Sequence, residues 1–329
     1  MMPLLDSLPG VEMPVSEVPG ALRELWSQTE HSDISGTGID QNYRAVQSNL
    51  ILHFGLATGQ EEARDILDQA LEFAGLYPCR IICLCPADRA GEQLLRGKLY
   101  SQCLLSGGGG HPVCSEALML GYSLEDSQFL EHQVSIWLES DLPTYHWFHR
   151  LPVDRIMECY MPFLKMVTRA TYDSSLEGSD DLSGIQWPCP RGARDLADAR
   201  LLHLRQGLGQ ALSSVHVEAL LGGLGKVQTI HGPGLAGEAR SLDKWISQCL
   251  GAAGKTDPIT HSVQEDPNLE GLRCIWNYSR GLGKSLNLET SRDLCRGMLV
   301  ADFGKGQQSF PLHLKKPTAA HALSEALFF

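Results

Sequence analysis

The order strand, helix, strand between residues 43 and 86 constrains the fold more than any other feature of the chain. The segment 43–55 (YRAVQSNLILHFG) ends in an apolar run that is typical of a strand. Residues 61–74 carry apolar side chains at the three- and four-residue spacing of one buried helix face. The segment 78–86 (PCRIICLCP) is a continuous apolar run, typical of a strand covered on both faces. This order predicts a βαβ unit and therefore an α/β domain.

The sequence that follows predicts more strands and helices of the same domain. Apolar spacing predicts helices over about 124–139 and 153–166, and Pro162 should kink or shorten the second helix. Further strands are expected at 98–105, 115–122 and 167–173.

The segment 141–150 (DLPTYHWFHR) is rich in aromatic and imidazole side chains. As a strand, it places Tyr145 and Trp147 on one face and the alternate residues on the other. His146 and His149 are three residues apart, so they should point to opposite faces and should not share a metal ion. The segment is therefore predicted to be a buried strand covered by helices.

Residues 174–194 are rich in Ser, Gly, Asp and Pro, which is typical of a linker. After them a helix should begin near Asp195, and strands then alternate with a second helix at 241–251. The predicted fold is α/β: an N-terminal βαβ-type sheet domain with flanking helices, then a smaller mixed α+β domain. The predicted boundaries are an irregular leader (1–40), the α/β domain (41–175), a linker (176–194) and the C-terminal domain (195–329).

The charge balance limits the partners that the chain can bind. Its formal net charge is −12, which argues against binding to the phosphate backbone of nucleic acid. No run of about 18 apolar residues is present, so no membrane-spanning helix is expected. The first twenty residues lack the pattern of a signal peptide, and we therefore expect a cytoplasmic protein without a membrane partner.

Ten cysteines are many for a cytoplasmic chain, and reduced thiols are expected there. Paired spacings of the kind that hold zinc do not occur, so no metal is predicted. The thiols between residues 79 and 114 are interpreted as small buried side chains on strands, and a redox-sensitive pair stays open. These thiols belong to Cys79, Cys83, Cys85, Cys103 and Cys114.

A glycine-rich loop at 106–112 (SGGGGHP) could cradle a phosphate with its backbone N–H groups. A nucleotide fingerprint, however, needs such glycines between a strand and a helix, and this loop joins two predicted strands. A hairpin connection is favoured, and no cofactor is predicted. The motifs of serine hydrolases and of P-loop nucleotide-binding proteins are also missing from the sequence.

Several charged residues stand at the edges of predicted elements, where the ends of a sheet collect binding groups. Capping and ion pairing explain such positions equally well, and both readings stay open at this point. These residues are Arg80, Glu116, Asp141, Asp173 and Arg200.

Six short motifs, in this order, resemble the glucose-6-phosphate dehydrogenase assembly protein family, OpcA. Together they extend over about two thirds of the chain. They are SNLILHF (48–54), YPCRIICL (77–84), CSEALML (114–120), DLPTYHWF (141–148), TYDSS (171–175) and DLADARLLHLRQGLGQAL (195–212).

This resemblance implies a non-catalytic assembly factor, not an enzyme. It implies an allosteric activator that binds glucose-6-phosphate dehydrogenase, in the pentose phosphate pathway of carbohydrate metabolism. The alternative is a binding module or enzyme for a sugar phosphate or nucleotide, which would use the sheet-edge residues and the loop 106–112. Interfaces rely on aromatic and arginine anchors. The candidate partner-binding residues are Arg80, Glu116, Asp141, Trp147, Asp173, Arg200 and Arg205.

Overall fold

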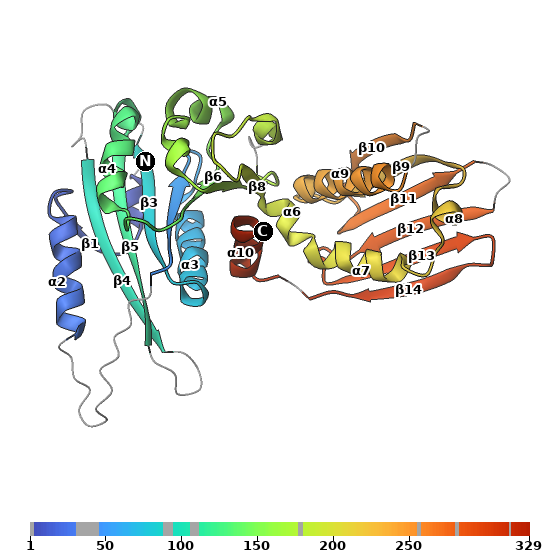
Figure 1. The fold of residues 1–329 in the computed structure, drawn as a ribbon, viewed down its shortest axis with the longest axis horizontal. Helices are drawn as coiled ribbons and strands as arrows, with labels where there is room; N and C mark the ends of the chain where they lie inside the picture. Colours follow the sequence, from blue (N-terminus) through green and yellow to red (C-terminus); the bar gives the residue numbers. More distant parts are fainter. Residues whose placement is uncertain are drawn as a thin grey trace. The chain divides into compact units, whose positions relative to one another are not determined.

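A computed structural model describes residues 3–30, 46–87, 95–105, 112–176, 180–254, 258–279, 283–315 and 317–329. The chain forms two compact units (Figure 1). Unit 1 comprises residues 1–172, 181–194 and 319–329, and unit 2 comprises residues 173–180 and 195–318.

Unit 1 is built on an eight-stranded sheet with the order β1-β4-β5-β3-β2-β6-β7-β8. The central strands β5, β3, β2, β6 and β7 run parallel, whereas β4 is antiparallel to both β5 and β1. This arrangement confirms the predicted α/β class and its βαβ unit. The strands are β1 (Val11–Met13), β2 (Ser48–Phe54), β3 (Cys79–Ala87), β4 (Leu95–Leu105), β5 (Pro112–Ser123), β6 (Thr144–His149), β7 (Arg169–Tyr172) and β8 (Ala193–Asp195).

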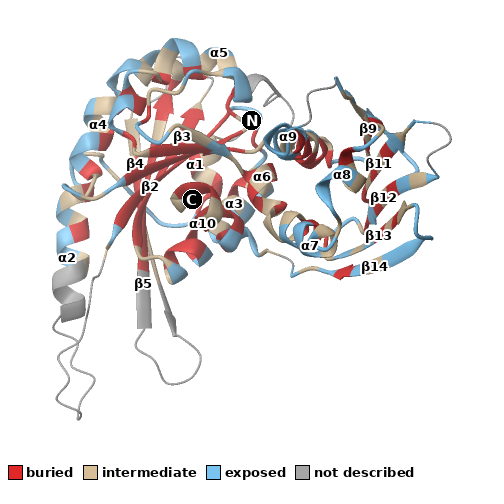
Figure 2. Ribbon diagram, turned by 45° about the vertical axis from the view of Figure 1, so that its right-hand side comes forward, coloured by how far each residue is buried: buried red, intermediate tan, exposed pale blue. Residues whose placement is uncertain are grey.

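Helix α3 (Gln60–Leu76) connects β2 to β3 and matches the predicted helix. Its buried residues include Ala63, Leu67, Ala70 and Ala74, which recur at helical spacing and face the core. Every residue of β2 is buried, as the continuous apolar run predicted for a strand with both faces covered. Figure 2 shows the inner strands of this sheet as buried.

The two other predicted helices of unit 1, 124–139 and 153–166, are each divided into shorter helical segments. Pro162 does interrupt the second predicted helix: α5 passes into one π-helical turn, and a 3₁₀ turn follows the proline. The helical segments are α1 (Leu4–Ser7), α2 (Val18–Glu30), η1 (Leu124–Phe129), α4 (Leu130–Trp137), α5 (Val153–Arg155), η2 (Ile156–Tyr160), η3 (Phe163–Met166), η4 (Asp180–Gly184) and α10 (Ala319–Phe328).

Three predicted boundaries differ from the structure. Within the predicted leader, residues 3–30 form α1, β1 and α2, and β1 joins the sheet. Within the predicted linker, Leu182 and Cys189 are buried in the core of unit 1. At the C-terminus, α10 belongs to unit 1, where Phe328 contacts the rings of Phe73 and Tyr145. Contacts between residues far apart in the sequence decide all three cases: strand pairing for β1, and apolar burial for the predicted linker and α10.

Unit 2 contains a six-stranded sheet with the order β10-β9-β11-β12-β13-β14. Only β10 and β9 are parallel, and they are joined by α9. The elements are α6 (Leu196–Arg200), α7 (Leu202–Leu212), α8 (Val217–Leu221), β9 (Leu224–His231), α9 (Ala236–Ala252), β10 (Thr260–Glu265), β11 (Leu272–Tyr278), β12 (Lys284–Thr290), β13 (Arg296–Phe303) and β14 (Gln308–His313).

The core of unit 2 lies between its helices and one face of this sheet. Along β11 and β12 buried residues alternate with more exposed ones, so Cys274, Trp276, Leu286 and Leu288 share the covered face. None of the described helices is long and apolar enough to cross a bilayer.

Candidate functional site

Arg80 and Glu116 face one another from β3 and β5 in the interior of unit 1. Arg80 Nε donates to Glu116 Oε1 at 2.6 Å, and the two side chains are only 7% and 1% exposed. Arg80 also donates from Nη1 to the Trp137 carbonyl and pairs through Nη2 with Glu139 at 2.8 Å. These contacts connect the C-terminal end of α4 to β3 and β5. The interpretation of these two residues as a structural ion pair is therefore favoured. Neither side chain is accessible to a partner protein.

Asp141 and Trp147 lie before and within β6. Asp141 is exposed in the turn and has a φ of 64°. Trp147 is 3% exposed, so it is a core residue and does not anchor a partner. His149 bonds Glu62 of α3 at 3.1 Å, whereas His146 bonds His53, which confirms that the two histidines of this strand do not act together.

Asp173 and Arg200 form the centre of a hydrogen-bonded cluster in unit 2. Arg200 donates to both oxygens of Asp173 at 2.8 and 2.9 Å, to Glu238 Oε1 at 2.7 Å and to Ser175 Oγ at 3.0 Å. Ser175 Oγ in turn donates to Glu238 Oε2 at 2.6 Å. The cluster joins the segment after β7 to α6 and to the first turn of α9. Because the guanidinium group of Arg200 donates its hydrogen bonds within this cluster, we interpret Arg200 as a structural residue that holds these segments together.

Arg205, on α7, instead pairs with the carboxylate of Asp198 and also donates to the Asp198 backbone carbonyl. The seven candidate residues thus lie in separate parts of the structure. Among the described residues they do not come together in one site. Residues 106–111 of the glycine-rich loop lie outside those residues. The alternative site for a sugar phosphate or nucleotide therefore receives no support, because Arg80 is bound to Glu116 and Asp173 to Arg200.

A buried chain of four polar side chains crosses the core of unit 1. His53 Nδ1 lies 3.2 Å from His146 Nε2, and His53 Nε2 lies 2.7 Å from the Tyr122 hydroxyl. The Tyr122 and Tyr160 hydroxyls are 2.7 Å apart. Burial lowers the pKa of His53 to about 3 and holds the pKa of His146 well below its ordinary value. Both imidazoles are therefore neutral, and all four side chains are at most 2% exposed.

No sequence pattern predicts this network. Its members come from β2, β5, β6 and the π-helical turn, and only the pairing of these elements brings them together. His146 Nδ1 is buried and has no hydrogen-bond partner among the described residues. Because all four side chains are buried, we treat the network as part of the core.

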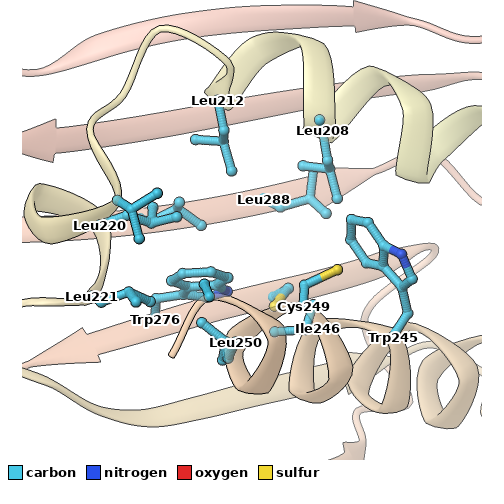
Figure 3. Close-up of a pocket in the computed structure, with 15 residues that line it drawn as sticks. Leu208, Leu212, Leu220, Leu221, Trp245, Ile246, Cys249, Leu250, Trp276 and Leu288 are labelled. Carbon is cyan, nitrogen blue, oxygen red and sulfur yellow. The ribbon is translucent and has the colours of Figure 1, made fainter. Parts of the chain in front are cut away.

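A cavity of about 220 Å³ lies in unit 2 between α7, α8, α9 and the covered face of β11 and β12 (Figure 3). Every side chain in its wall is aliphatic, tryptophan or cysteine. The wall consists of Leu208, Gly209, Leu212, Val217, Leu220, Leu221, Trp245, Ile246, Cys249, Leu250, Ala253, Cys274, Trp276, Leu286 and Leu288.

The periodicity of the helices explains this lining. Leu208 and Leu212 are one turn apart on α7, and Ile246, Cys249 and Leu250 lie on one face of α9. In Figure 3 the two helices face one another across the cavity, with β11 and β12 behind them. The apolar faces of both helices were predictable from the sequence, but the space left between them was not.

Two side chains from the strands hold α8 in the cavity wall. Tyr278 donates its hydroxyl to the Leu220 carbonyl at 2.9 Å. Lys284 Nζ donates to the carbonyls of Ala219 and Gly222 at 2.9 and 3.0 Å. These carbonyls lie at the C-terminal end of α8, where backbone acceptors need outside partners and a positive charge is favourable. The wall contributed by α8 is therefore fixed to the sheet.

The cavity is also poor in charge. Its lining contains no acidic or basic residue. Burial raises the pKa of the Cys249 thiol, an effect that nearby Arg205 partly opposes, so the thiol stays protonated at neutral pH. No group of three or more metal-ligating side chains occurs in the part of the chain that the structure describes. The arrangement can enclose an apolar molecule but offers no set of groups for acid–base or nucleophilic chemistry.

Comparison with known proteins assigns no family. Neither a protein-family model nor a curated protein matches the chain. Among solved structures, it is similar to the crystal structure of aldose-aldose oxidoreductase from Caulobacter crescentus complexed with glycerol. The two share 11% sequence identity with a TM-score of 0.40, over 85% of this chain and 87% of that one. At this level the likeness gives this chain neither an activity nor a substrate.

The match nevertheless stands against the function expected from the motifs. The protein in the solved structure is an oxidoreductase, and thus an enzyme, whereas the motifs implied a non-catalytic activator of glucose-6-phosphate dehydrogenase. The assembly role and the prediction that the chain is not an enzyme are contradicted and are not carried further. The resemblance of the six motifs to the OpcA family is tested by none of these matches and stays a prediction.

Proposed function

We propose that this protein binds a small apolar molecule in the cavity of unit 2. One observation carries the proposal: a cavity of about 220 Å³ is walled entirely by aliphatic, tryptophan and cysteine side chains. Ligand pockets in proteins are concave and lined mainly by hydrophobic and aromatic residues. Apolar cavities of comparable size, about 150 Å³, stay dry and bind benzene or xenon.

The hydrogen bonds that hold α8 in the cavity wall support binding to a preformed site. Tyr278 and Lys284 secure α8 with three hydrogen bonds to its C-terminal carbonyls. A ligand entering such a site orders few additional side chains, so less of its binding free energy is lost to conformational entropy. Apolar side chains around an unfilled cavity lack packing partners on that side, and a ligand would restore those contacts.

The direct test is ligand-dependent thermal stability, with naphthalene and 1-octanol as probes. A molecule that binds the native state raises its melting temperature by mass action. We expect a rise of several degrees for at least one probe, together with a change in the emission of Trp245 and Trp276 in the cavity wall.

Two variants on α9 make the test specific to the cavity. Cys249→Trp fills the cavity from a position at its exposed rim, and Gln248→Trp adds the same ring at an exposed position outside the lining. The first variant should lose the ligand-dependent rise and the second should keep it. If neither probe shifts the melting temperature of the unmodified protein up to its solubility limit, the proposal is wrong.

We also infer a cytoplasmic location. It is supported by the eight cysteines whose side chains the structure describes, since they form no disulfide, as expected in a reducing compartment. Fractionation of cells that express the untagged chain tests this location directly, and recovery outside the cytoplasmic fraction would overturn it.

A further inference from the structure

We infer that the molecule bound in this cavity is the straight aliphatic chain of an amphiphile whose polar head stays in water. The inference rests on the proposed function and specifies the chemistry of its ligand. It follows from the polarity of the wall, the size and form of the cavity, and the exposure of its rim.

The wall favours a hydrocarbon over a polar ligand. Its side chains carry no hydrogen-bonding group except the indoles of Trp245 and Trp276 and the thiols of Cys249 and Cys274. The Cys274 thiol already lies 4.0 Å from the Thr229 hydroxyl, which donates to it. A hydroxyl or amide placed inside would lose its hydrogen bonds to water and find few replacements, which is costly.

Two cations near the cavity, Arg205 and Lys284, are already engaged. Arg205 is paired with Asp198, and Lys284 donates to two backbone carbonyls of the α8 segment. The formal net charge of the whole chain is −12. An anionic head therefore gains no ready partner, and the surrounding field opposes it. A neutral polar head is the better match.

The cavity follows the facing helices, which favours a chain over a compact ring system. It is bounded by α9 and its C-cap from Trp245 to Ala253, eight helical steps that span roughly 12 Å at the helical rise of about 1.5 Å per residue. On the opposite side Leu208 and Leu212 lie one helical turn apart (Figure 3). If about 150 Å³ accommodates the six carbons of benzene, then this volume accommodates roughly nine carbons.

The rim leaves a place for the head group. Gly209, Val217, Cys249 and Ala253 line the cavity and are themselves exposed, so the cavity meets solvent along their side. A bound chain can thus bury its methylene groups among the leucines while its head remains hydrated, which is how amphipathic groups partition at protein surfaces.

The experiment is a chain-length series of primary alcohols, from hexanol to dodecanol, titrated against the full chain by tryptophan fluorescence. Each added methylene that enters the cavity should tighten binding roughly fourfold. The gain should cease near nine carbons, where the cavity is full. Cys249→Trp should move this limit to shorter chains, and Gln248→Trp should leave it unchanged.

The outcomes separate this inference from the proposed function. Binding of naphthalene without any dependence of alcohol affinity on chain length would overturn the aliphatic class and leave apolar binding in place. Failure of both naphthalene and the alcohols would overturn the proposed function as well. Decanoate serves as the anionic counterpart of decanol, and tighter binding of decanoate would overturn the assignment of a neutral head.

Discussion

Arg80 and Glu116 pair at 2.6 Å between two parallel strands, with side chains that are 7% and 1% exposed. An ion pair removed from water to this degree is intolerant of losing one member, because the remaining charge keeps its desolvation penalty without its partner.

Arg80→Ala should therefore lower the free energy of unfolding by about 3–5 kcal/mol. The measurement is urea denaturation followed by circular dichroism. The double variant R80M/E116L replaces both charges with apolar groups of similar size and should recover most of the loss. A single variant as stable as the unmodified chain would show that the buried pair contributes nothing.

The neutral histidines of unit 1 predict a loss of stability in acid. His53 has a pKa of about 3 in the fold, and the pKa of His146 is also far below the unfolded value of about 6.5. Above pH 6.5 neither state gains a proton at these groups, so their contribution is fully present. As the pH falls from 6.5 toward 3, the unfolded state takes up protons that the folded state rejects, and the stability of the fold declines.

Each histidine should contribute a slope of about 1.4 kcal/mol per pH unit in this range. His146→Asn removes one titrating group and should reduce the slope between pH 6 and pH 5 by about that amount, as measured by denaturation at each pH. Equal slopes for the variant and the unmodified chain would mean that His146 is protonated in both states.

A second substitution tests the close packing beside the Arg200 cluster. A Cβ added at Gly237 would lie 2.5 Å from Ser175 Oγ and 2.6 Å from Ser174 Oγ. Gly237→Ala should therefore destabilise unit 2 by about 1–3 kcal/mol, in the range for overpacking. The matched control is Gly251→Ala on the same helix, where no atom lies within 4 Å of the added carbon and alanine should be neutral or stabilising. Equal effects of the two changes in thermal denaturation would exclude this clash.

Thiol accessibility gives a fourth independent test. Cys249 is the exposed one among the eight cysteines whose side chains are described, whereas Cys79, Cys83 and Cys85 are buried. Burial raises the pKa of all four thiols, and it raises that of Cys85 to about 12. In the folded protein iodoacetamide should alkylate Cys249 well before the other three, as followed by peptide mass spectrometry.

A bound alcohol should slow this alkylation, because Cys249 lies in the cavity wall. Rapid modification of Cys79, Cys83 or Cys85 without unfolding would instead revive the redox-sensitive pair that the sequence left open. For Cys103 and Cys114, which were part of the same hypothesis, the side chains lie outside the described residues.

Local sequence patterns were sufficient to predict several elements of this protein. The continuous apolar runs of β2 and β3 and the spaced alanines and leucines of α3 specify buried strands and a one-sided helix, since periodicity reflects which side chains must leave water. Pro162 marked a break in a helix for an equally local reason, its missing N–H group. The alternation in β6 likewise placed His146 and His149 on opposite faces.

How these elements pack against one another became evident only in the folded chain. Arg80 could have been a binding residue until β5 brought Glu116 beside it. The C-terminal helix could not be assigned to unit 1 from its own residues, because its apolar face fits any core. The cavity depends most on tertiary packing: the leucines of α7 and the Trp245 face of α9 are patterned like ordinary core residues. Whether such faces meet or leave a space is set by the distance at which the sheet holds the helices, and no local pattern encodes that distance.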